Sequence, residues 1–471
     1  MTQLRTGALS AFLWISVLSI GCAAASAPGE TTRQVSGDGP PGYLIRNASL
    51  VLTMDPHLGS GALGALADAD VLIMGDQIAA VGQGLEAPGG ARVIHGDGMI
   101  VMPGFVDTHD HLWQSSIRGC GADDNLIGWL NRCVFTIGGS TFTEEDAYAV
   151  VRLSTVGLIN AGVTAVNDWS HNFNPDFLRG NIRALMDSGL RFHFSMRQRT
   201  LDGSDVLATK AQFFDPNPLA TLQIGPRAAA AVEADFAAMV QVAKEHGLKI
   251  HTHFLEHPDE LLDDAFGVIV RSGALELGND LILAHAIHLT DEEVAILGEA
   301  GVSVTHQPLS NMRLASGIIR FGDLKAAGVQ LSLGLDGGTN DTPDAFNNMR
   351  AAVGLQRVKF VDAAVSPTVE EVLRLATLGG AELLDLDDEV GSLTPGKQAD
   401  VIVINPNRLN FAPRMNWVNQ LVFNGQNQNI EWVFVAGRAL KKKGEVVGVK
   451  EGDLVAGAEA VAAKLLPLVD E

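Results

Sequence analysis

Cysteine is scarce in this sequence. Only three cysteines occur among 471 residues, and no two of them form a Cys-x-x-Cys pair. A zinc site of the kind that requires Pro-Cys-x-x-Cys is therefore excluded. Cys22 lies in an apolar N-terminal run, which leaves Cys120 and Cys133. Two cysteines are too few for a disulfide framework, so we expect separate thiols, although an oxidising compartment would allow them to pair.

Basic residues are also few. The chain has 33 Lys and Arg against 55 Asp and Glu, a formal net charge of −22. A surface this acidic repels nucleic acid and anionic membranes, so we expect neither as a partner. Sequence repeats of 20–50 residues are absent as well, which argues against a solenoid or propeller. Hydrophobic residues make up 46% of the chain, enough for the core of a large enzyme.

The N-terminus carries an apolar run that is too short to span a membrane. Arg5 is the only charge before this run, which covers residues 7–22. The pattern predicts a signal peptide over residues 1–27, cut after Ala27. Residues 28–42 are rich in Gly, Pro, Ser and Thr, which is typical of a linker. We therefore expect an exported, periplasmic protein.

The segment Ile20-Gly-Cys22 supports a second interpretation of the same run. It is similar to a bacterial lipoprotein cleavage site, although Ser19 stands where Leu is usual. In that case Cys22 would carry a lipid that anchors the protein to the cell envelope.

Short alternating strands are concentrated in two places, residues 43–98 and 396–450. Asp70–Met74 and Ile430–Gly437 are examples. Strand-rich ends around a different central block predict one small β-sandwich built from both termini. Residues 451–471 follow as a C-terminal helix or tail.

The central block, residues 99–395, alternates apolar strands with amphipathic helices such as Glu144–Asn160 and Glu233–His246. This alternation is typical of parallel β/α units. Eight such units predict an α/β fold with a (β/α)8 TIM-type barrel, whose active site lies at the C-terminal ends of the strands. The expected strands are Gly104–Asp107, Val163–Asp168, Leu190–Ser195, Thr221–Ile224, Leu248–His251, Leu281–Ala284, Val302–Thr305 and Val329–Gly334.

Two histidines one residue apart, His109 and His111, end the first of these strands. Strand side chains alternate between faces, so both imidazoles point the same way. Two neutral imidazoles at one strand tip form half of a metal site. In isolation they could also be two unrelated polar residues, but residues able to bind metal close later strands too.

Those later residues occupy matching positions at strand ends. The fifth strand ends in His251-Thr-His253, with Glu256 three residues beyond, His285 closes the sixth, and Asp336 closes the eighth. The C-terminal ends of barrel strands meet at one face, so these side chains are expected to converge there. Spacing does not choose between His251 and His253, because both share a face of the strand.

The stretch Pro103–His111, followed by Ser-Ile-Arg-Gly, resembles the first-strand signature of the amidohydrolase superfamily. The resemblance extends over residues 43–447 and includes Ala376–Ala381 and Gly391–Asp400. It is strongest to the metal-dependent branch with adenosylhomocysteine, guanine and cytosine deaminases and the triazine hydrolases. By family analogy the protein is expected to be a homo-oligomer that acts on a small molecule.

The resemblance implies roles for the residues at the strand ends. The family's His-x-x-Glu motif matches His253–Glu256, which implies that His253 is a ligand and that His251 belongs to the core or supports the ligands from below. Three His and one carboxylate suit a single divalent ion, Zn²⁺ or alternatively Fe²⁺, with one position left open. The implied ligands are His109, His111, His253 and Asp336.

A second metal ion is not expected. Binuclear relatives use a bridging carboxylated Lys on a barrel strand. The four Lys between residues 101 and 340 are poorly placed for this, because none closes a strand and Lys249 begins the fifth strand at the opposite end of the barrel.

The ligands and their neighbours suggest a mechanism. A bound divalent ion lowers the pKa of its water towards ~7, which provides a hydroxide at neutral pH. Asp336 would take the proton of this water, and Glu256 would pass a proton to a ring or amide nitrogen. His285 would hold the hydroxide or the developing oxyanion. Glu256 has an alternative role as a carboxylate that caps a helix at Pro258.

We therefore expect a hydrolase that acts on carbon–nitrogen bonds other than peptide bonds, with deamination of an N-heterocycle favoured. Hydrolysis of an amide, urea, carbamate or cyclic amide by the same site is the alternative. A catalytically inactive periplasmic binding protein would be expected to lack Glu256 or Asp336, and both are present.

Several further residues are candidates for substrate contacts. Trp113, Gln114 and Trp129 follow the first strand, where relatives contact substrate, and Arg197 lies near the carboxylate-binding Arg of adenosylhomocysteine deaminases. Relatives carry Gly-Pro-His-Ser-Pro after the fourth strand, whereas this chain has Arg227 in place of the His. Two arginines at the pocket would suit a substrate with an anionic or carbonyl-rich tail.

Three other histidines have plain structural interpretations. His288 and His306 are expected in the core or behind the ligands. Asp168–His171 could line the mouth of the site or simply pack.

Overall fold

The computed structural model of the protein describes residues 42–138, 142–226, 233–337 and 343–469. The signal peptide expected over residues 1–27, Cys22 and Arg227 lie outside the described residues, so these interpretations stay predictions. No helix in the described part of the chain is long and apolar enough to cross a membrane.

Eight parallel strands form a nearly closed barrel, which confirms the predicted α/β barrel fold. Neighbours pair in the order β15-β14-β13-β12-β11-β10-β9-β8. The first and last strands also meet, because the Asp336 amide donates to the His109 carbonyl at 2.8 Å. The strands are β8 (Phe105–Asp110), β9 (Val163–Ser170), β10 (Arg191–Met196), β11 (Ala220–Ile224), β12 (Ile250–Phe254), β13 (Leu281–His285), β14 (Ser303–His306) and β15 (Gln330–Leu333).

Each of the eight predicted strands is present, with ends displaced by a few residues. The fifth is the clearest case, because β12 begins at Ile250 instead of Leu248 and continues to Phe254. Both His251 and His253 therefore lie inside the strand and on the same face.

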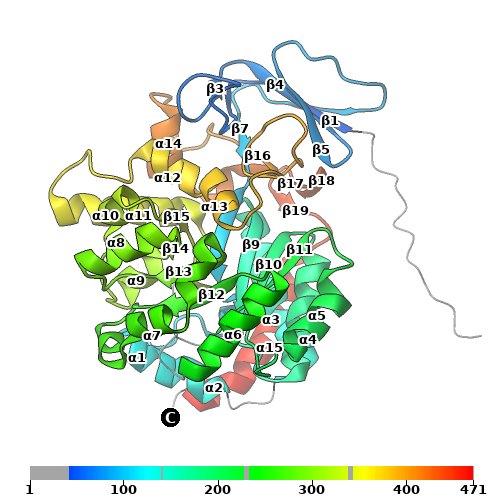
Figure 1. The fold of residues 1–471 in the computed structure, drawn as a ribbon. Coiled ribbons are helices and arrows are strands. Elements are labelled where there is room, and N and C mark those ends of the chain that lie inside the picture. The colour runs from blue at the N-terminus through cyan, green and yellow to red at the C-terminus, as the bar shows by residue number, and fades with distance from the viewer. Residues whose placement is uncertain (1–41, 139–141, 227–232, 338–342, 470–471) are drawn as a thin grey trace, which may run out of the picture. The chain divides into compact units, whose positions relative to one another are not determined.

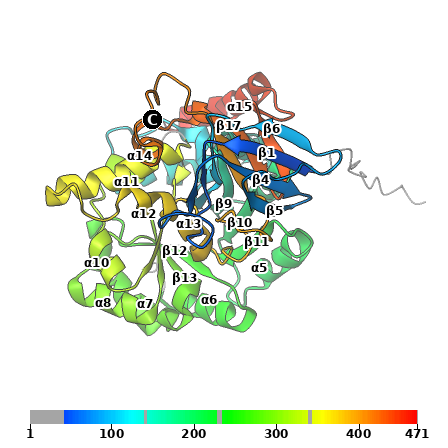
Figure 2. The same cartoon turned by 90° about the horizontal axis from the view of Figure 1, so that it is seen from above.

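Helices cover the outside of the barrel, as Figures 1 and 2 show. The long helices α3 and α6 have the predicted bounds, and a capping box between Thr143 and Asp146 explains where α3 starts. The helices are α1 (Leu126–Trp129), α2 (Thr136–Gly138), α3 (Glu144–Asn160), α4 (Pro175–Ser188), α5 (Ser204–Thr209), α6 (Glu233–His246), α7 (Ala265–Arg271), α8 (Asp291–Ala300), α9 (Pro308–Arg313), α10 (Phe321–Ala326), α11 (Ala345–Phe360), α12 (Val369–Leu375), α13 (Leu378–Leu383), α14 (Trp417–Asn424) and α15 (Glu451–Val469).

Two mixed sheets come from the segments before and after the barrel. One has the order β5-β4-β1-β6 and the other β19-β18-β17-β16-β7-β2-β3, and residues of both share a hydrophobic core. The small β-sandwich built from both termini is thus confirmed. The strands are β1 (Gly42–Ala48), β2 (Leu50–Leu52), β3 (Ala65–Leu66), β4 (Ala69–Met74), β5 (Gln77–Gly82), β6 (Arg92–His95), β7 (Ile100–Pro103), β16 (Val401–Ile404), β17 (Ile430–Val435), β18 (Arg438–Lys442) and β19 (Glu445–Val446).

The sandwich adjoins the N-terminal end of the barrel strands. Strand β7 runs into β8 through Gly104, where a Cβ would lie 2.1 Å from the Thr164 side chain, so only Gly fits. Nearby, the buried Arg191 of β10 contacts Glu389 at 3.0 Å and Asp400 at 3.5 Å. This end of the barrel is thus closed, and the other end is left for chemistry.

A disulfide joins Cys120 to Cys133, so the expectation of separate thiols is wrong. The two cysteines are 13 residues apart in sequence, but the turn after η1 (Leu112–Ile117) and the helical segment η2 (Leu130–Phe135) bring their Cα atoms to 6.1 Å. That separation lies within the range that a disulfide requires. Sequence spacing alone could not reveal this approach.

Candidate metal centre and active site

The residues expected to bind metal come from three strand ends at the C-terminal side of the barrel. His109 and His111 lie at the end of β8, His253 in β12, and Asp336 just after β15. Asp336 has a positive φ of 65°. An Asp seldom adopts this left-handed backbone, and such strain is concentrated at functional sites, where it aims a side chain that regular backbone could not.

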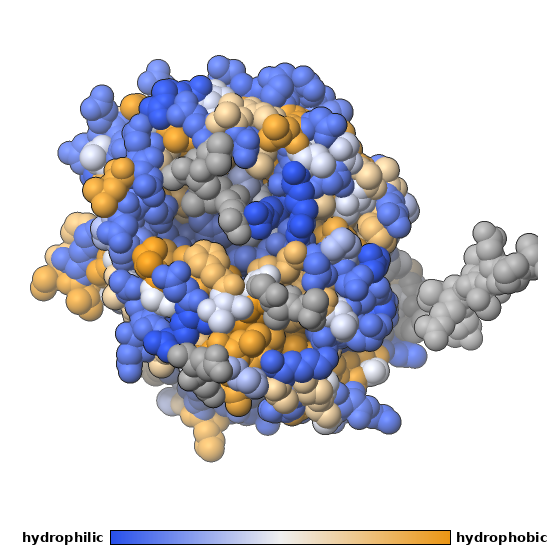
Figure 3. All heavy atoms as spheres, turned by 90° about the horizontal axis from the view of Figure 1, so that it is seen from below, coloured by the Kyte–Doolittle hydropathy of each residue, from blue (hydrophilic) through white to orange (hydrophobic). Residues whose placement is uncertain are grey.

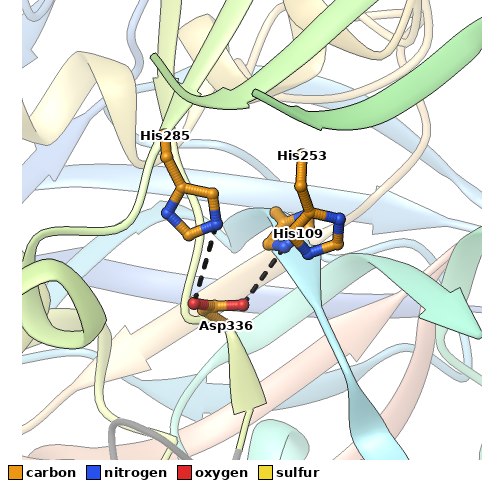
Figure 4. Close-up of side chains that lie close together, drawn as sticks. All are labelled: His109, His253, His285 and Asp336. Carbon is orange, nitrogen blue, oxygen red and sulfur yellow. Dashed lines mark ion pairs between the residues drawn. The ribbon is translucent and has the colours of Figure 1, made fainter. Parts of the chain in front are cut away.

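These side chains converge on one point, and Figure 4 shows three of them, His109, His253 and Asp336, together with His285. The Asp336 Oδ1 atom lies 3.1 Å from His109 Nε2 and 3.4 Å from His111 Nε2. The Nε2 atoms of His111 and His253 are 3.0 Å apart. Nitrogen and oxygen atoms this close can share a single cation.

His285 also belongs to this cluster. Ligand atoms of His109, His253, His285 and Asp336 all lie within 4.8 Å of one another. His285 Nε2 lies 4.0 Å from Asp336 Oδ2 and 3.3 Å from Glu256 Oε2. The His285 ring therefore lies between Asp336 and Glu256, where it can contact both.

Glu256 is buried and faces His285. Burial raises the pKa of the Glu256 carboxyl to about 8. Glu256 does not cap a helix, because His257 is the N-cap of the short helix Pro258–Asp263. The backbone amide of Glu256 instead donates a hydrogen bond to the Glu260 carboxylate. A buried carboxyl beside the metal-binding cluster has the position of a proton carrier.

Two contacts orient the rings of the cluster, and sequence reasoning missed both. His111 Nδ1 lies 2.7 Å from the Trp169 carbonyl, to which it donates, so its Nε2 is left with a lone pair. His285 Nδ1 lies 2.8 Å from Asn311 Oδ1. The sequence offered one signal for this contact, a polar Asn311 in α9, the helix that follows β14.

Electrostatics differ between the rings. Burial lowers the pKa of His109 and of His253 well below the ordinary value, so both are neutral and keep a lone pair. Burial also acts on His285, but the charges of Glu256 and Asp336 outweigh it and raise the pKa of this ring. The site thus combines neutral imidazoles, which can bind a cation, with one imidazole, His285, that gains a proton more readily.

The donors present fit a divalent cation. In the described part of the chain, His109 Nε2 is buried and makes no hydrogen bond, although Asp336 Oδ1 lies 3.1 Å away. Leaving a buried polar atom unpaired costs about 1–3 kcal/mol, which a cation would offset. Imidazole nitrogens with one carboxylate oxygen are the donor set that zinc prefers.

The candidate substrate residues lie in different surroundings. Trp113 is fully buried, and its indole donates to His171 Nδ1 at 3.0 Å. Gln114 and Trp129 are also buried, whereas Arg197 directly follows β10 and is partly exposed. Figure 3 shows a hollow bordered mainly by hydrophilic residues on the side where α1 and α2 lie. Contact of these residues with substrate stays a prediction.

Three further residues named in the sequence analysis lie in the barrel or beside it. Lys249 precedes β12, and its ammonium pairs with Asp280 at 2.9 Å and Asp385 at 2.8 Å, so it is not placed to bridge two metal ions. His288 Nε2 contacts the Ser316 carbonyl at 2.8 Å. His306 is buried at the end of β14.

A protein-family model describes the same region of the chain. The amidohydrolase family model matches residues 100–440. A 5-methylthioadenosine/S-adenosylhomocysteine deaminase of Pelotomaculum thermopropionicum is 30% identical over 438 residues, which cover 90% of this chain and 98% of that protein. A 5'-deoxyadenosine deaminase of Methanothermobacter thermautotrophicus is 30% identical over 442 residues, with 89% and 99% covered.

A solved structure is similar to this protein over nearly its whole length. The crystal structure of an adenosine deaminase from Xanthomonas campestris with bound zinc has a TM-score of 0.81 and 26% identity, and the match covers 90% of this chain and 98% of that one.

The barrel, the His and Asp cluster and the buried Glu256 define a metal-dependent hydrolase. The chain belongs to the amidohydrolase family, as its sequence motifs predict. It is an enzyme that hydrolyses carbon–nitrogen bonds other than peptide bonds.

Proposed function

We propose that this protein deaminates the adenine-type ring of a nucleoside derivative, with one zinc ion held by His109, His111, His253 and Asp336. The observation that carries the proposal is the convergence of these four side chains beside the buried Glu256 and His285. The relatives that match over nearly their whole length are deaminases of adenosine derivatives, which supports this substrate class.

The ion would supply an activated water, because a bound divalent cation lowers the pKa of its water and makes it nucleophilic. Asp336 accepts the proton that the attacking water loses. Glu256 donates a proton to the ring nitrogen beside the reacting carbon, which makes that carbon more electrophilic. His285, held by Asn311, donates a hydrogen bond to the developing oxyanion. Water adds to the carbon, the amino group leaves as ammonia, and a carbonyl remains.

The first experiment is a substrate panel. Purified enzyme loaded with zinc should release ammonia from 5'-substituted adenosines, measured by a coupled ammonia assay and by the loss of adenine absorbance. Aminopurines, pterins, triazines, ureas and cyclic amides complete the panel. If Arg197 contacts an anionic tail, Arg197→Ala should raise KM for carboxylate-bearing substrates by about 10-fold, the loss of one charge-assisted hydrogen bond.

Controls separate the possible results. Arg199, which is exposed and follows the same strand, gives the matched variant Arg199→Ala, and its KM should not change. Release of an amine or acid from ureas or amides without ammonia from adenosines would favour the alternative hydrolysis. Activity confined to phosphoesters or lactones would contradict the carbon–nitrogen assignment.

We also propose that the protein is exported, as the apolar N-terminal run predicts. The Cys120–Cys133 disulfide supports this location, because disulfides persist in oxidising compartments and are rare in the cytosol. Mass spectrometry of the protein from its native host should find a mature N-terminus at Pro28, or at a lipid-modified Cys22. An intact Met1 on cytosolic protein with free thiols would contradict export.

A further inference from the structure

A layer of buried polar side chains fills the barrel next to the candidate metal centre. Seven of the eight barrel strands contribute one member each, and every member has an exposed fraction of 0%. Barrel interiors of this kind are usually filled with Val, Ile and Leu, so a polar layer needs an explanation. The polar layer consists of Thr108, Asn167, Ser195, Gln223, His251, Thr305 and Ser332.

Hydrogen bonds between strands that are not neighbours show that these side chains point inward. Thr108 of β8 bonds to Thr305 of β14 at 2.6 Å, and Gln223 of β11 donates to Asn167 of β9 at 2.9 Å. Such contacts are possible only across the inside of the barrel.

The polar layer has two halves. In the first, Thr108 bonds to Thr305 and, at 2.7 Å, to Ser332. In the second, which we call the Asn167 group, Asn167 contacts Ser195 at 2.9 Å, Gln223 at 2.9 Å and His251 Nδ1 at 2.5 Å. A complete network of this kind is rigid. Removing one member leaves its neighbours buried and unpaired, which costs free energy.

The Asn167 group contacts the metal centre directly, through the side chain of His251. His251 Nε2 lies 2.9 Å from His109 Nδ1. The position of His251 is fixed further by the indole of Trp169, which donates to its carbonyl oxygen at 2.9 Å. His109 Nε2, on the opposite edge of the same ring, lies 3.1 Å from Asp336.

We propose that His251, held by Asn167, is a positioning residue that fixes the orientation and tautomer of His109 for metal binding. This inference rests on the proposed metal site, with His109 as a ligand through Nε2. A neutral imidazole that offers Nε2 to a cation carries its hydrogen on Nδ1, and His251 Nε2 is the acceptor for that hydrogen.

Asn167 in turn sets the tautomer of His251. His251 then carries its own hydrogen on Nδ1, which faces the terminal amide of Asn167. As placed, the Asn167 nitrogen faces His251 and its oxygen accepts from Ser195 and Gln223. A half-turn of the Asn167 amide supplies the acceptor for His251 and gives up the 3.2 Å bond to the Thr108 carbonyl. The Ser195 hydroxyl and the Gln223 amide, whose Oε1 has no hydrogen-bond partner, then re-orient to stay paired with Asn167. The chain of hydrogen bonds thus runs from His109 through His251 to Asn167.

Zinc release tests the proposal without relying on turnover. Zinc-loaded full-length variants are mixed with a chromogenic chelator, and the dissociation constant is obtained by competition. His251→Leu should raise the zinc dissociation constant by about 10–100-fold, the usual effect of losing such a partner. His251→Gln keeps an acceptor for His109 and should stay near the wild type. Ser332→Ala, in the other half of the polar layer, is the matched control and should leave zinc affinity unchanged.

A second pair of variants keeps the test decisive if His251→Leu does not fold. Asn167→Asp provides acceptor oxygens for His251 and should retain zinc, whereas Asn167→Leu should weaken zinc binding. Folded His251→Leu and Asn167→Leu proteins with wild-type zinc affinity would overturn the proposal, as would equal weakening by Asn167→Asp and Asn167→Leu. A wild-type protein that binds no zinc would instead contradict the metal site itself.

Discussion

Asp336→Ala protein should be purified without its divalent ion and should lose kcat/KM by at least about 10³-fold. Asp336 supplies the only carboxylate of the proposed ligand set, and its Oδ1 atom lies within 3.4 Å of two histidine nitrogens. A bound cation contributes several kcal/mol of transition-state stabilisation, and about 1.4 kcal/mol corresponds to a factor of ten in rate. Metal content is measured by mass spectrometry of dissolved protein, and activity by ammonia release.

The control for this variant is Asp291→Ala. Asp291 has a side chain that is 93% exposed on α8, and its removal should change neither zinc content nor activity. Wild-type protein should hold about one ion per chain. Two ions per chain, or full occupancy in the double variant His109→Ala/His111→Ala, would contradict the single-ion site.

Glu256→Gln should keep its zinc and lose turnover by about 10²-fold or more. The substitution preserves the shape of the side chain but removes the transferable proton, and general acid–base catalysis contributes about 10²–10⁴-fold. Glu256 Oε2 contacts His285 at 3.3 Å, so the amide still fits beside the ring. Zinc content and kcat are measured on the same preparation, and KM should change much less than kcat.

Glu299→Gln makes the same chemical change at an exposed position of α8 and serves as the control. Near wild-type turnover in the Glu256→Gln protein would remove Glu256 from proton transfer. Loss of zinc together with turnover would assign Glu256 to metal binding instead.

Much of the fold followed from the sequence, because it depends on local pattern. The period of apolar residues distinguished strands from helices, and α3 and α6 have the predicted bounds. Eight alternating units required a barrel, and parallel strands bring their C-terminal ends to one face. The residues at those ends, such as His109, His253 and Asp336, could therefore be expected to lie together.

The spacing of residues could not decide whether His251 or His253 binds the metal. Both side chains lie on one face of β12, so only a family motif separated them. In the structure they occupy different levels of the barrel. His253 meets His111 at 3.0 Å, whereas His251 contacts His109 Nδ1 and the Asn167 group.

By itself, the sequence determined the element order, the barrel and the kinds of side chain at the strand ends. Tertiary structure alone decided which atoms meet: Asn311 with His285, Cys120 with Cys133, and His251 with His109. The physical reason is that local periodicity sets which face a residue occupies, whereas contacts between residues as far apart as 142 positions depend on the closure and stagger of the barrel.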